Sequence, residues 1–212
     1  MRTLKSDRIH RNFMSSLEVR RKSVHIISGI VITYIILSFQ RDLLLILTFL
    51  GLFITLLIAY SVKKGVKVPV IDRVLQSCER EDAMMKLPGK GVLMFTLSLL
   101  ILLLVVQDTV LIAAAVLTLA LGDGFATIVG LRWGKHTLIG KKSVEGSLAF
   151  FFASLIGLLL LLKPEYAILA ALSGMLIELI PQEIVDDNIT IPIGVGLILM
   201  MVGRVGGGSP LI

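Results

Sequence analysis

Residues 109–131 read TVLIAAAVLTLALGDGFATIVGL, an apolar stretch whose single charged residue is Asp123. A run of this length predicts a membrane-crossing helix, because about 20 apolar residues span the hydrocarbon layer of a bilayer. The rest of the 212-residue chain is similar: 56% of its residues are hydrophobic, 17% are charged and its mean hydropathy is +0.93. The sequence therefore predicts an all-α, polytopic integral membrane helical bundle.

Six further apolar runs flank this stretch. They comprise residues 24–40, 43–62, 91–107, 146–162, 166–177 and 189–203. Together the runs predict about seven transmembrane helices, several of them short enough to require local thinning of the bilayer. We expect three parts: a basic cytosolic N-terminal segment (1–23), a membrane-embedded core (24–204) and a flexible C-terminal tail (205–212).

The basic residues are distributed unequally between the two ends of the predicted bundle. Of the 21 Lys and Arg residues, 18 fall before odd-numbered helices and three fall on the opposite side. This asymmetry predicts a cytosolic N-terminus by the positive-inside rule. The net charge of +6 does not indicate nucleic acid as a partner, because no basic face carries interleaved aromatic residues.

Asp123 is the first candidate functional residue, because an ionised acid inside a membrane helix is costly unless it is paired, solvated or bound to metal. The neighbouring Gly122 and Gly124 would let a ligand or another helix approach closely. The alternative is a packing motif in which the acid pairs with a lysine. Near the N-terminus, Glu18, Lys22 and His25 share one helical face, either as a polar stripe entering the membrane or as an ion pair beside a hydrogen-bonded histidine.

The starts of the third, fifth and seventh predicted helices are polar or rich in glycine. They contain Lys90, the stretch from Gly140 to Ser143, and Asn188. Backbone N–H groups and lysines at helix starts predict binding of anions, phosphate above all, although ordinary capping by Ser143 and Asn188 is the alternative.

Two loop clusters supply further candidates for a phosphate and metal site. The first contains Lys135, Lys141, Lys142, Ser143, Glu145 and Gly146, which suit a triphosphate although no Walker loop occurs. The second contains Glu178, Asp186, Asp187 and Asn188, whose hard oxygen ligands suit Mg²⁺ completed by substrate phosphates. A solvated basic loop and acids paired with basic loops are the respective alternatives.

These motifs resemble one known family. They are Glu18-x-x-Arg21-Lys22-x-x-His25-x-x-x-Gly29, Gly122-Asp123-Gly124-x-Ala126-x-x-x-Gly130-x-x-Trp133-Gly134-Lys135, Lys142-Ser143-x-Glu145-Gly146 and Asp187-Asn188-x-x-x-Pro192. In this order they are similar to the CTP-dependent lipid-alcohol kinases, which include dolichol, phytol and farnesol kinases and the yeast-type diacylglycerol kinase. The resemblance extends from about Glu18 to Gly194.

The resemblance implies transfer of the γ-phosphoryl group of CTP to a membrane isoprenoid alcohol or diacylglycerol, with Mg²⁺ as cofactor. It places Asp123 at the centre of the nucleotide and metal site, and Lys142, Ser143, Glu145 and Gly146 in the CTP-binding stretch. We expect Asp123, Asp187 and Lys142 to be catalytic and Asp123, Asp187 and Glu178 to bind metal. Lys90, Lys135, Lys141, Gly122 and Gly124 are expected on the nucleotide side, with Glu18, Lys22, His25 and Asn188 on the substrate side.

Two alternative functions are considered for the same residues. A phosphatidate-type cytidylyltransferase would make a CDP-lipid from CTP, but its C-terminal Pro-Gly-His-Gly-Gly signature is absent from the sequence. A proton-coupled transporter or flippase would use Asp123 and Glu178 as proton relays, and it would usually show related halves with broken helices.

Overall fold

The computed structural model describes residues 2–64, 89–140, 142–181 and 185–205, with side chains described from Leu17 to Arg204. Within these ranges every regular element is a helix, and one isolated bridge joins Thr137 to Ser143. The helices are α1 (Arg2–Ser38), α2 (Arg41–Lys63), α5 (Lys90–Val105), α6 (Thr109–Leu117), η1 (Thr118–Asp123), α7 (Gly124–Trp133), α8 (Val144–Leu158), α9 (Pro164–Glu178) and α10 (Asp187–Val205).

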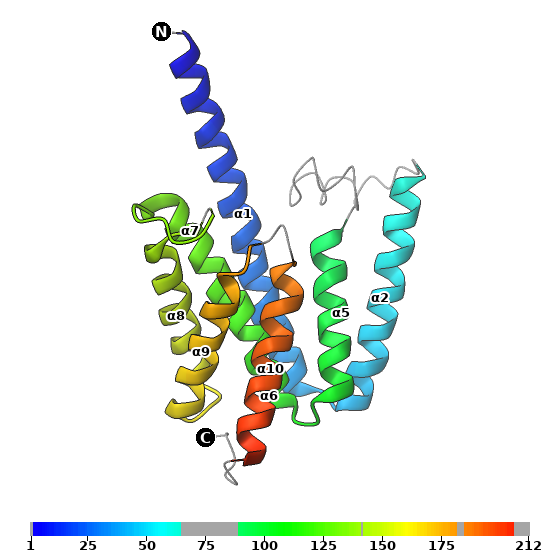
Figure 1. Cartoon of the computed structure of the whole chain (residues 1–212). Helices are drawn as coiled ribbons and strands as arrows, with labels where there is room; N and C mark the ends of the chain where they lie inside the picture. The colour runs from blue at the N-terminus through cyan, green and yellow to red at the C-terminus, as the bar shows by residue number, and fades with distance from the viewer. Residues whose placement is uncertain (1, 65–88, 141, 182–184, 206–212) are drawn as a thin grey trace.

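The helices run up and down in one bundle. The start of α1 and the end of α10 lie at opposite ends of the bundle, and α5, α8 and α10 all begin at the end from which α1 projects (Figure 1). Each of the predicted apolar runs matches an observed helix, with α6, η1 and α7 forming one of them. The predicted all-helical class is therefore confirmed.

Among the described residues, four helical segments are long and apolar enough to cross a membrane. They are Leu17–Ser38, Arg41–Lys63, Thr109–Trp133 and Asp187–Arg204. The apolar helices α5 and α8 are shorter, and the 15 residues of α8 extend about 22 Å at 1.5 Å per residue. The backbone of α1 is continuously helical from Arg2, so no break separates the predicted segment 1–23 from the first apolar run. Most of the predicted tail lies outside the described residues.

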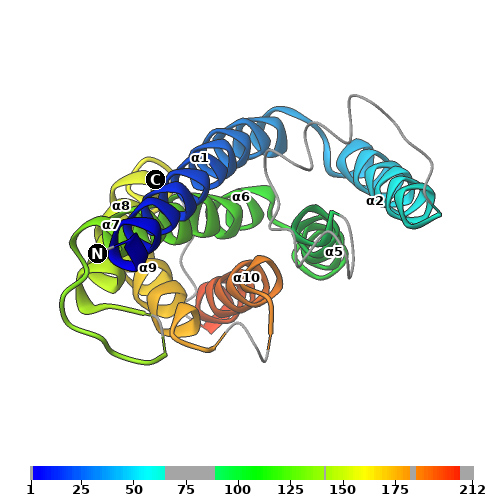
Figure 2. The same cartoon turned by 90° about the horizontal axis from the view of Figure 1, so that it is seen from above.

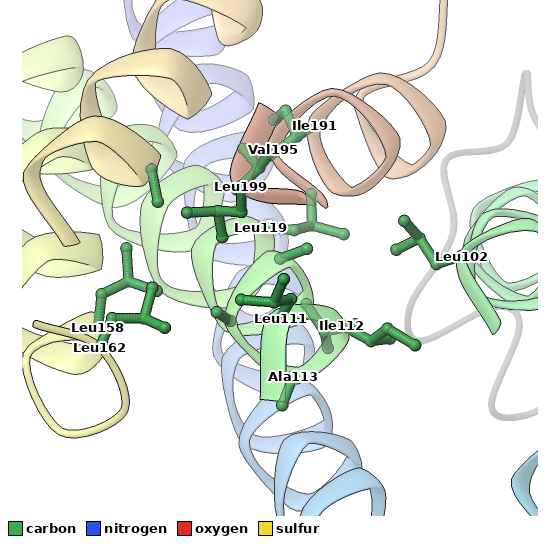
Figure 3. Packing of buried hydrophobic residues seen from close by; sticks show 14 of the residues in the cluster. Leu102, Leu111, Ile112, Ala113, Leu119, Leu158, Leu162, Ile191, Val195 and Leu199 are labelled. Carbon is green, nitrogen blue, oxygen red and sulfur yellow. The ribbon is translucent and has the colours of Figure 1, made fainter. Parts of the chain in front are cut away.

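The helix formed by α6, η1 and α7 is the centre of the bundle. Every residue of α6 from Leu111 to Leu117 is buried, and α1, α8, α9 and α10 surround this helix in the view from above (Figure 2). Figure 3 shows Leu119 of η1 beside Leu199 of α10, with Leu111 and Ile112 of α6 further along the central helix. A helix that is apolar on all sides lies either in a protein core or among lipid chains, and this one lies within the bundle.

The segment η1 is π-helical, a feature that the sequence analysis did not predict. It begins at Thr118 and ends at Asp123, in the middle of an otherwise α-helical run. Short π-helical turns occur within α-helices frequently at functional sites, because they change the direction of the side chains that follow. Here the π-helical turn ends on the acid of the central helix.

Candidate functional site

The buried carboxylate of Asp123 is paired with a lysine from another helix. The Lys22 ammonium on α1 donates to Asp123 Oδ2, and both side chains are less than a tenth exposed. The Nε2 atom of His25, one turn further along α1, lies 3.8 Å from the same carboxylate oxygen. Of the two interpretations of Asp123 drawn from the sequence, the pairing of the acid with a lysine describes the observed contact. The lysine, Lys22, belongs to the polar stripe predicted on the first helix.

A second buried group of charges surrounds Lys142, in the connection between α7 and α8. Its Nζ atom lies 2.5 Å from Glu178 Oε1, 2.6 Å from the Glu178 backbone oxygen and 3.4 Å from Asp187 Oδ2. Glu178 ends α9 and Asp187 begins α10, and both acids are buried. The fold thus brings together candidates from both loop clusters of the sequence, Lys142 from the first and Glu178 and Asp187 from the second.

The two groups are electrostatically linked into one site. Lys142 interacts with Asp123 as well as with Glu178 and Asp187. Burial disfavours the charged form of Lys142, but these three carboxylates outweigh that effect and raise the pKa of its side chain above the ordinary value. Lys142 is therefore an ammonium ion at neutral pH. We call Lys22, Asp123, Lys142, Glu178 and Asp187 the acid–lysine cluster.

Helix α1 contributes to the site through the face predicted from the sequence. Lys22 and His25 face the central helix, and Gly29 lies so close to it that a Cβ atom there would be 2.2 Å from the Cβ of Ala120. Glu18, also buried, accepts a 2.8 Å hydrogen bond from Arg21. The absence of a side chain at Gly29 therefore lets α1 approach closely enough for Lys22 to reach Asp123.

The glycines beside Asp123 leave room for neighbouring helices. A Cβ atom at Gly122 would lie 2.5 Å from ring carbons of Phe150 on α8, and one at Gly124 would lie 2.4 Å from Ile26 on α1. The Phe150 ring is fully buried and also contacts the position of Gly174 on α9. Of the two partners considered from the sequence, a ligand or another helix, the structure places a helix at both glycines.

We expect Gly122→Ala to destabilise the protein and to lower its activity, because the added methyl group must displace the Phe150 ring. Overpacking of this kind costs about 1–3 kcal/mol. Thermal unfolding in detergent would measure the loss, and Phe150→Leu in the same chain should restore part of it. Gly51→Ala is the matched control, since a Cβ atom there meets nothing within 4 Å. Equal stability of the two alanine variants would contradict this packing role.

The stretch predicted to bind a triphosphate contains a helix cap, Ser143, and an acid that contacts the preceding loop, Glu145. Ser143 Oγ accepts a 3.1 Å hydrogen bond from the backbone N–H of Gly146, and this confirms Ser143 as the cap of α8. A Cβ atom at Gly146 would lie 3.0 Å from the backbone oxygen of Ala126, so α7 and α8 are in close contact here.

Glu145 lies partly exposed in the first turn of α8, before the apolar run that starts at residue 146. It accepts hydrogen bonds from the backbone N–H of Lys135 and from the His136 ring, the latter at 2.7 Å. The hydrogen bond from its own backbone N–H, followed by that from the His136 side chain, lowers the pKa of Glu145 to about 2. Glu145 thereby fixes the position of the loop after α7.

The starts of α5 and α10 are joined by charges on the same end of the bundle. Lys90 Nζ lies 3.1 Å from Asp186 Oδ2, and Asp186 Oδ1 accepts a hydrogen bond from the backbone N–H of Asn188. The cap of α10 is therefore Asp186, and the alternative reading of Asn188 as the cap of this helix does not hold. Lys141 lies outside the described residues.

The donor set in this site fits a hard cation without forming a complete cage. Among the described residues, no three His, Cys, Asp and Glu side chains are already grouped so as to hold a metal ion. Glu178 Oε2 is buried and has no hydrogen-bond partner in the described part of the chain. Mg²⁺ commonly takes one or two carboxylates and completes its shell with water and substrate phosphates. Glu178, with its unsatisfied oxygen, and Asp187 meet that requirement.

Phe150 and the π-helical turn are the features of the site that sequence reasoning missed. Phe150 lies in an uninterrupted apolar run, so nothing in the sequence distinguishes it from its neighbours. The partner of each lysine was also unknown, because Lys22 and Asp123 are 101 positions apart in the chain.

No known protein-family model and no solved structure matches the chain. Over 131 residues it is 32% identical to the probable phytol kinase, chloroplastic, of Triticum aestivum, a match that covers 53% of this chain and 44% of the wheat protein. Over 189 residues it is 31% identical to the uncharacterized protein MJ1137 of Methanocaldococcus jannaschii, and this match covers 86% of this chain and 92% of that protein. The chain therefore belongs to the same family as MJ1137.

Proposed function

We propose that the protein is a CTP-dependent lipid kinase. It transfers the γ-phosphoryl group of CTP to the hydroxyl of a membrane isoprenoid alcohol, of the dolichol, geranylgeraniol or phytol type, or to that of diacylglycerol. The observation that carries the proposal is the acid–lysine cluster, a group of buried charges in a bundle of apolar helices. The similarity of the chain to a probable phytol kinase supports the same class of reaction.

The composition of the cluster suits phosphoryl transfer, which depends mainly on positioning and on charge stabilisation. Lys142 follows the loop that contains Lys135, and both precede the start of α8. Lysines and helix N-termini stabilise the negative charge of phosphate oxygens. We assign Lys142 and Lys135 to the nucleotide side of the site.

Mg²⁺ is the proposed cofactor, and Glu178 and Asp187 are the residues best placed to hold it, since they already surround one positive charge. When bound, the ion would neutralise charge on the phosphate oxygens. Asp123 remains a predicted ligand as well, and its carboxylate interacts electrostatically with both Lys142 and Glu178.

Helix α1 offers a path for the lipid alcohol, because it lies at the periphery of the bundle (Figure 2). Its outer face carries exposed apolar side chains, including Ile27 and Val31, while Lys22 and His25 face Asp123. Asp123 contacts α1 through Lys22, whereas Asp187 lies at the start of α10. We therefore assign Asp123 as the acceptor of the hydroxyl proton. The hydroxyl oxygen then attacks the γ-phosphorus in line and CDP leaves.

We further propose that the helices of all seven apolar runs cross the membrane, with the N-terminus and the acid–lysine cluster near the cytosolic face. Of the 21 basic residues, 18 lie on the side of the bundle where the odd-numbered helices are expected to begin, and this supports the orientation. The shorter helices α5, α8 and α9 would then lie where the bilayer is locally thin.

The test incubates the purified protein with Mg²⁺ and a mixture of dolichol, geranylgeraniol, phytol and diacylglycerol. CTP is supplied with its label at either the γ- or the α-phosphorus. We expect only the γ label to enter the lipid, and the labelled product identifies the alcohol. Entry of the α label after addition of phosphatidic acid would instead indicate a cytidylyltransferase. Absence of label from any nucleotide would contradict the kinase proposal and favour a transporter.

A further inference from the structure

The surroundings of the Lys142 ammonium resemble the coordination shell of a metal ion. Two oxygens of Glu178, one from its carboxylate and one from its backbone, lie 2.5 Å and 2.6 Å from Nζ, and Asp187 Oδ2 lies at 3.4 Å. Carboxylate and backbone carbonyl oxygens are the ligands that hard divalent cations take in proteins. The backbone oxygen belongs to the last residue of α9, where the helix dipole is negative.

A second feature of this place also indicates a cation. The Glu178 side chain is 6% exposed, and its other carboxylate oxygen, Oε2, is buried without a hydrogen-bond partner among the described residues. A buried carboxylate oxygen that accepts no hydrogen bond is costly, so the group is incompletely satisfied by one ammonium. A divalent ion carries twice the charge and binds more oxygen atoms.

We propose that the Lys142 ammonium takes the place of a divalent cation between Glu178 and Asp187, and that the metal ion displaces it. The side chain of Lys142, once displaced, is free to bind phosphate oxygens. Metal and nucleotide binding are coupled in this way, because the nucleotide provides a new partner for the lysine that the metal releases. The proposal rests on the proposed function in taking Mg²⁺ as the physiological ion and a nucleotide as the source of the phosphate oxygens.

Mn²⁺ binding to the full-length protein, measured by electron paramagnetic resonance without nucleotide or lipid, tests this exchange. Lys142→Gln removes the competing charge, and we expect it to bind one Mn²⁺ about tenfold more tightly than the unaltered protein. Mn²⁺ should also raise the unfolding temperature of this variant more, followed through the fluorescence of the single tryptophan, Trp133.

Two control variants separate this effect from a general change in charge. Lys142→Gln with Glu178→Gln removes a ligand together with the lysine, and it should lose the tight Mn²⁺ site. Lys64→Gln removes an equal charge from a lysine that lies over the Tyr60 ring, and it should bind Mn²⁺ like the unaltered protein. Equal Mn²⁺ affinity of Lys142→Gln and the unaltered protein would overturn the proposal.

The unaltered protein provides a second measurement if Lys142→Gln does not fold. Saturating Mn²⁺ should increase the reactivity of Lys142 toward an amine-directed label, detected by mass spectrometry, while the labelling of Lys64 stays constant. Unchanged labelling of Lys142 would overturn the exchange. Because neither measurement uses nucleotide or lipid, an active kinase that fails both would contradict the exchange alone. A protein that passes both and phosphorylates no alcohol would contradict only the proposed function.

Discussion

Asp123→Asn is expected to reduce phosphoryl transfer by about 10²- to 10⁴-fold, the usual contribution of a positioned acid or base. The asparagine keeps the size of the side chain, but it neither accepts the hydroxyl proton nor carries the charge that faces Lys22. Transfer of the γ label from CTP to the alcohol measures the loss.

Asp42→Asn provides the matched control for this substitution. Asp42 is an exposed acid in the first turn of α2, and its amide variant should retain the activity of the unaltered protein. Activity of Asp123→Asn equal to that of Asp42→Asn would remove Asp123 from the mechanism.

Lys22→Gln is expected to lower the free energy of unfolding by about 3–5 kcal/mol, because it leaves the buried Asp123 carboxylate without its paired charge. Thermal or denaturant unfolding in detergent measures this change. Arg21→Gln is the comparison: it breaks an ion pair with Glu18 in which the arginine side chain is 37% exposed, and it should cost about 1 kcal/mol or less.

The double variant Lys22→Gln with Asp123→Asn separates stability from catalysis. It replaces the buried ion pair by two neutral amides, so it should regain most of the stability lost in Lys22→Gln. It should remain inactive, because the acid is still missing. Losses that simply add in the double variant would show that Lys22 and Asp123 do not interact energetically.

The positions of the helices were predictable from the sequence because polar residues end each apolar run. The predicted starts at Thr109 and at residue 146 lie within two residues of the observed starts of α6 and α8, which are capped by Asp108 and Ser143. The start of α1 was not predictable from hydropathy, since its first residues are basic rather than apolar. Their backbone is nevertheless helical from Arg2.

The candidate site could be predicted as a set of residues and not as a set of contacts. Lys22, Asp123, Lys142, Glu178 and Asp187 were all proposed, because each is a charge placed in or beside an apolar run. Which lysine faces which acid depends on how helices far apart in the sequence pack together. Both sequence alternatives, an acid paired with a lysine and acids paired with a basic loop, describe the contacts that the fold makes.

The packing around Asp123 depends on shapes that a single sequence does not reveal. The sequence identifies Gly122 and Gly124 as small residues. The bulky side chains that fill the space beside them, Phe150 and Ile26, come from other helices. The π-helical turn that ends at Asp123 arises in the same crowded region, and its residues Leu119, Ala120 and Leu121 favour an ordinary α-helix.

The most direct test of the account compares γ-labelled phosphate transfer from CTP to an isoprenoid alcohol by the unaltered protein and by the stable double variant Lys22→Gln with Asp123→Asn. Both proteins are reconstituted in the same lipid nanodiscs with Mg²⁺, and their folding is verified by thermal unfolding. We expect labelled lipid phosphate from the unaltered protein and none above background from the folded double variant. Equal labelling by the two proteins, or none by either, would contradict the assignment of this chain as a lipid kinase that depends on Asp123.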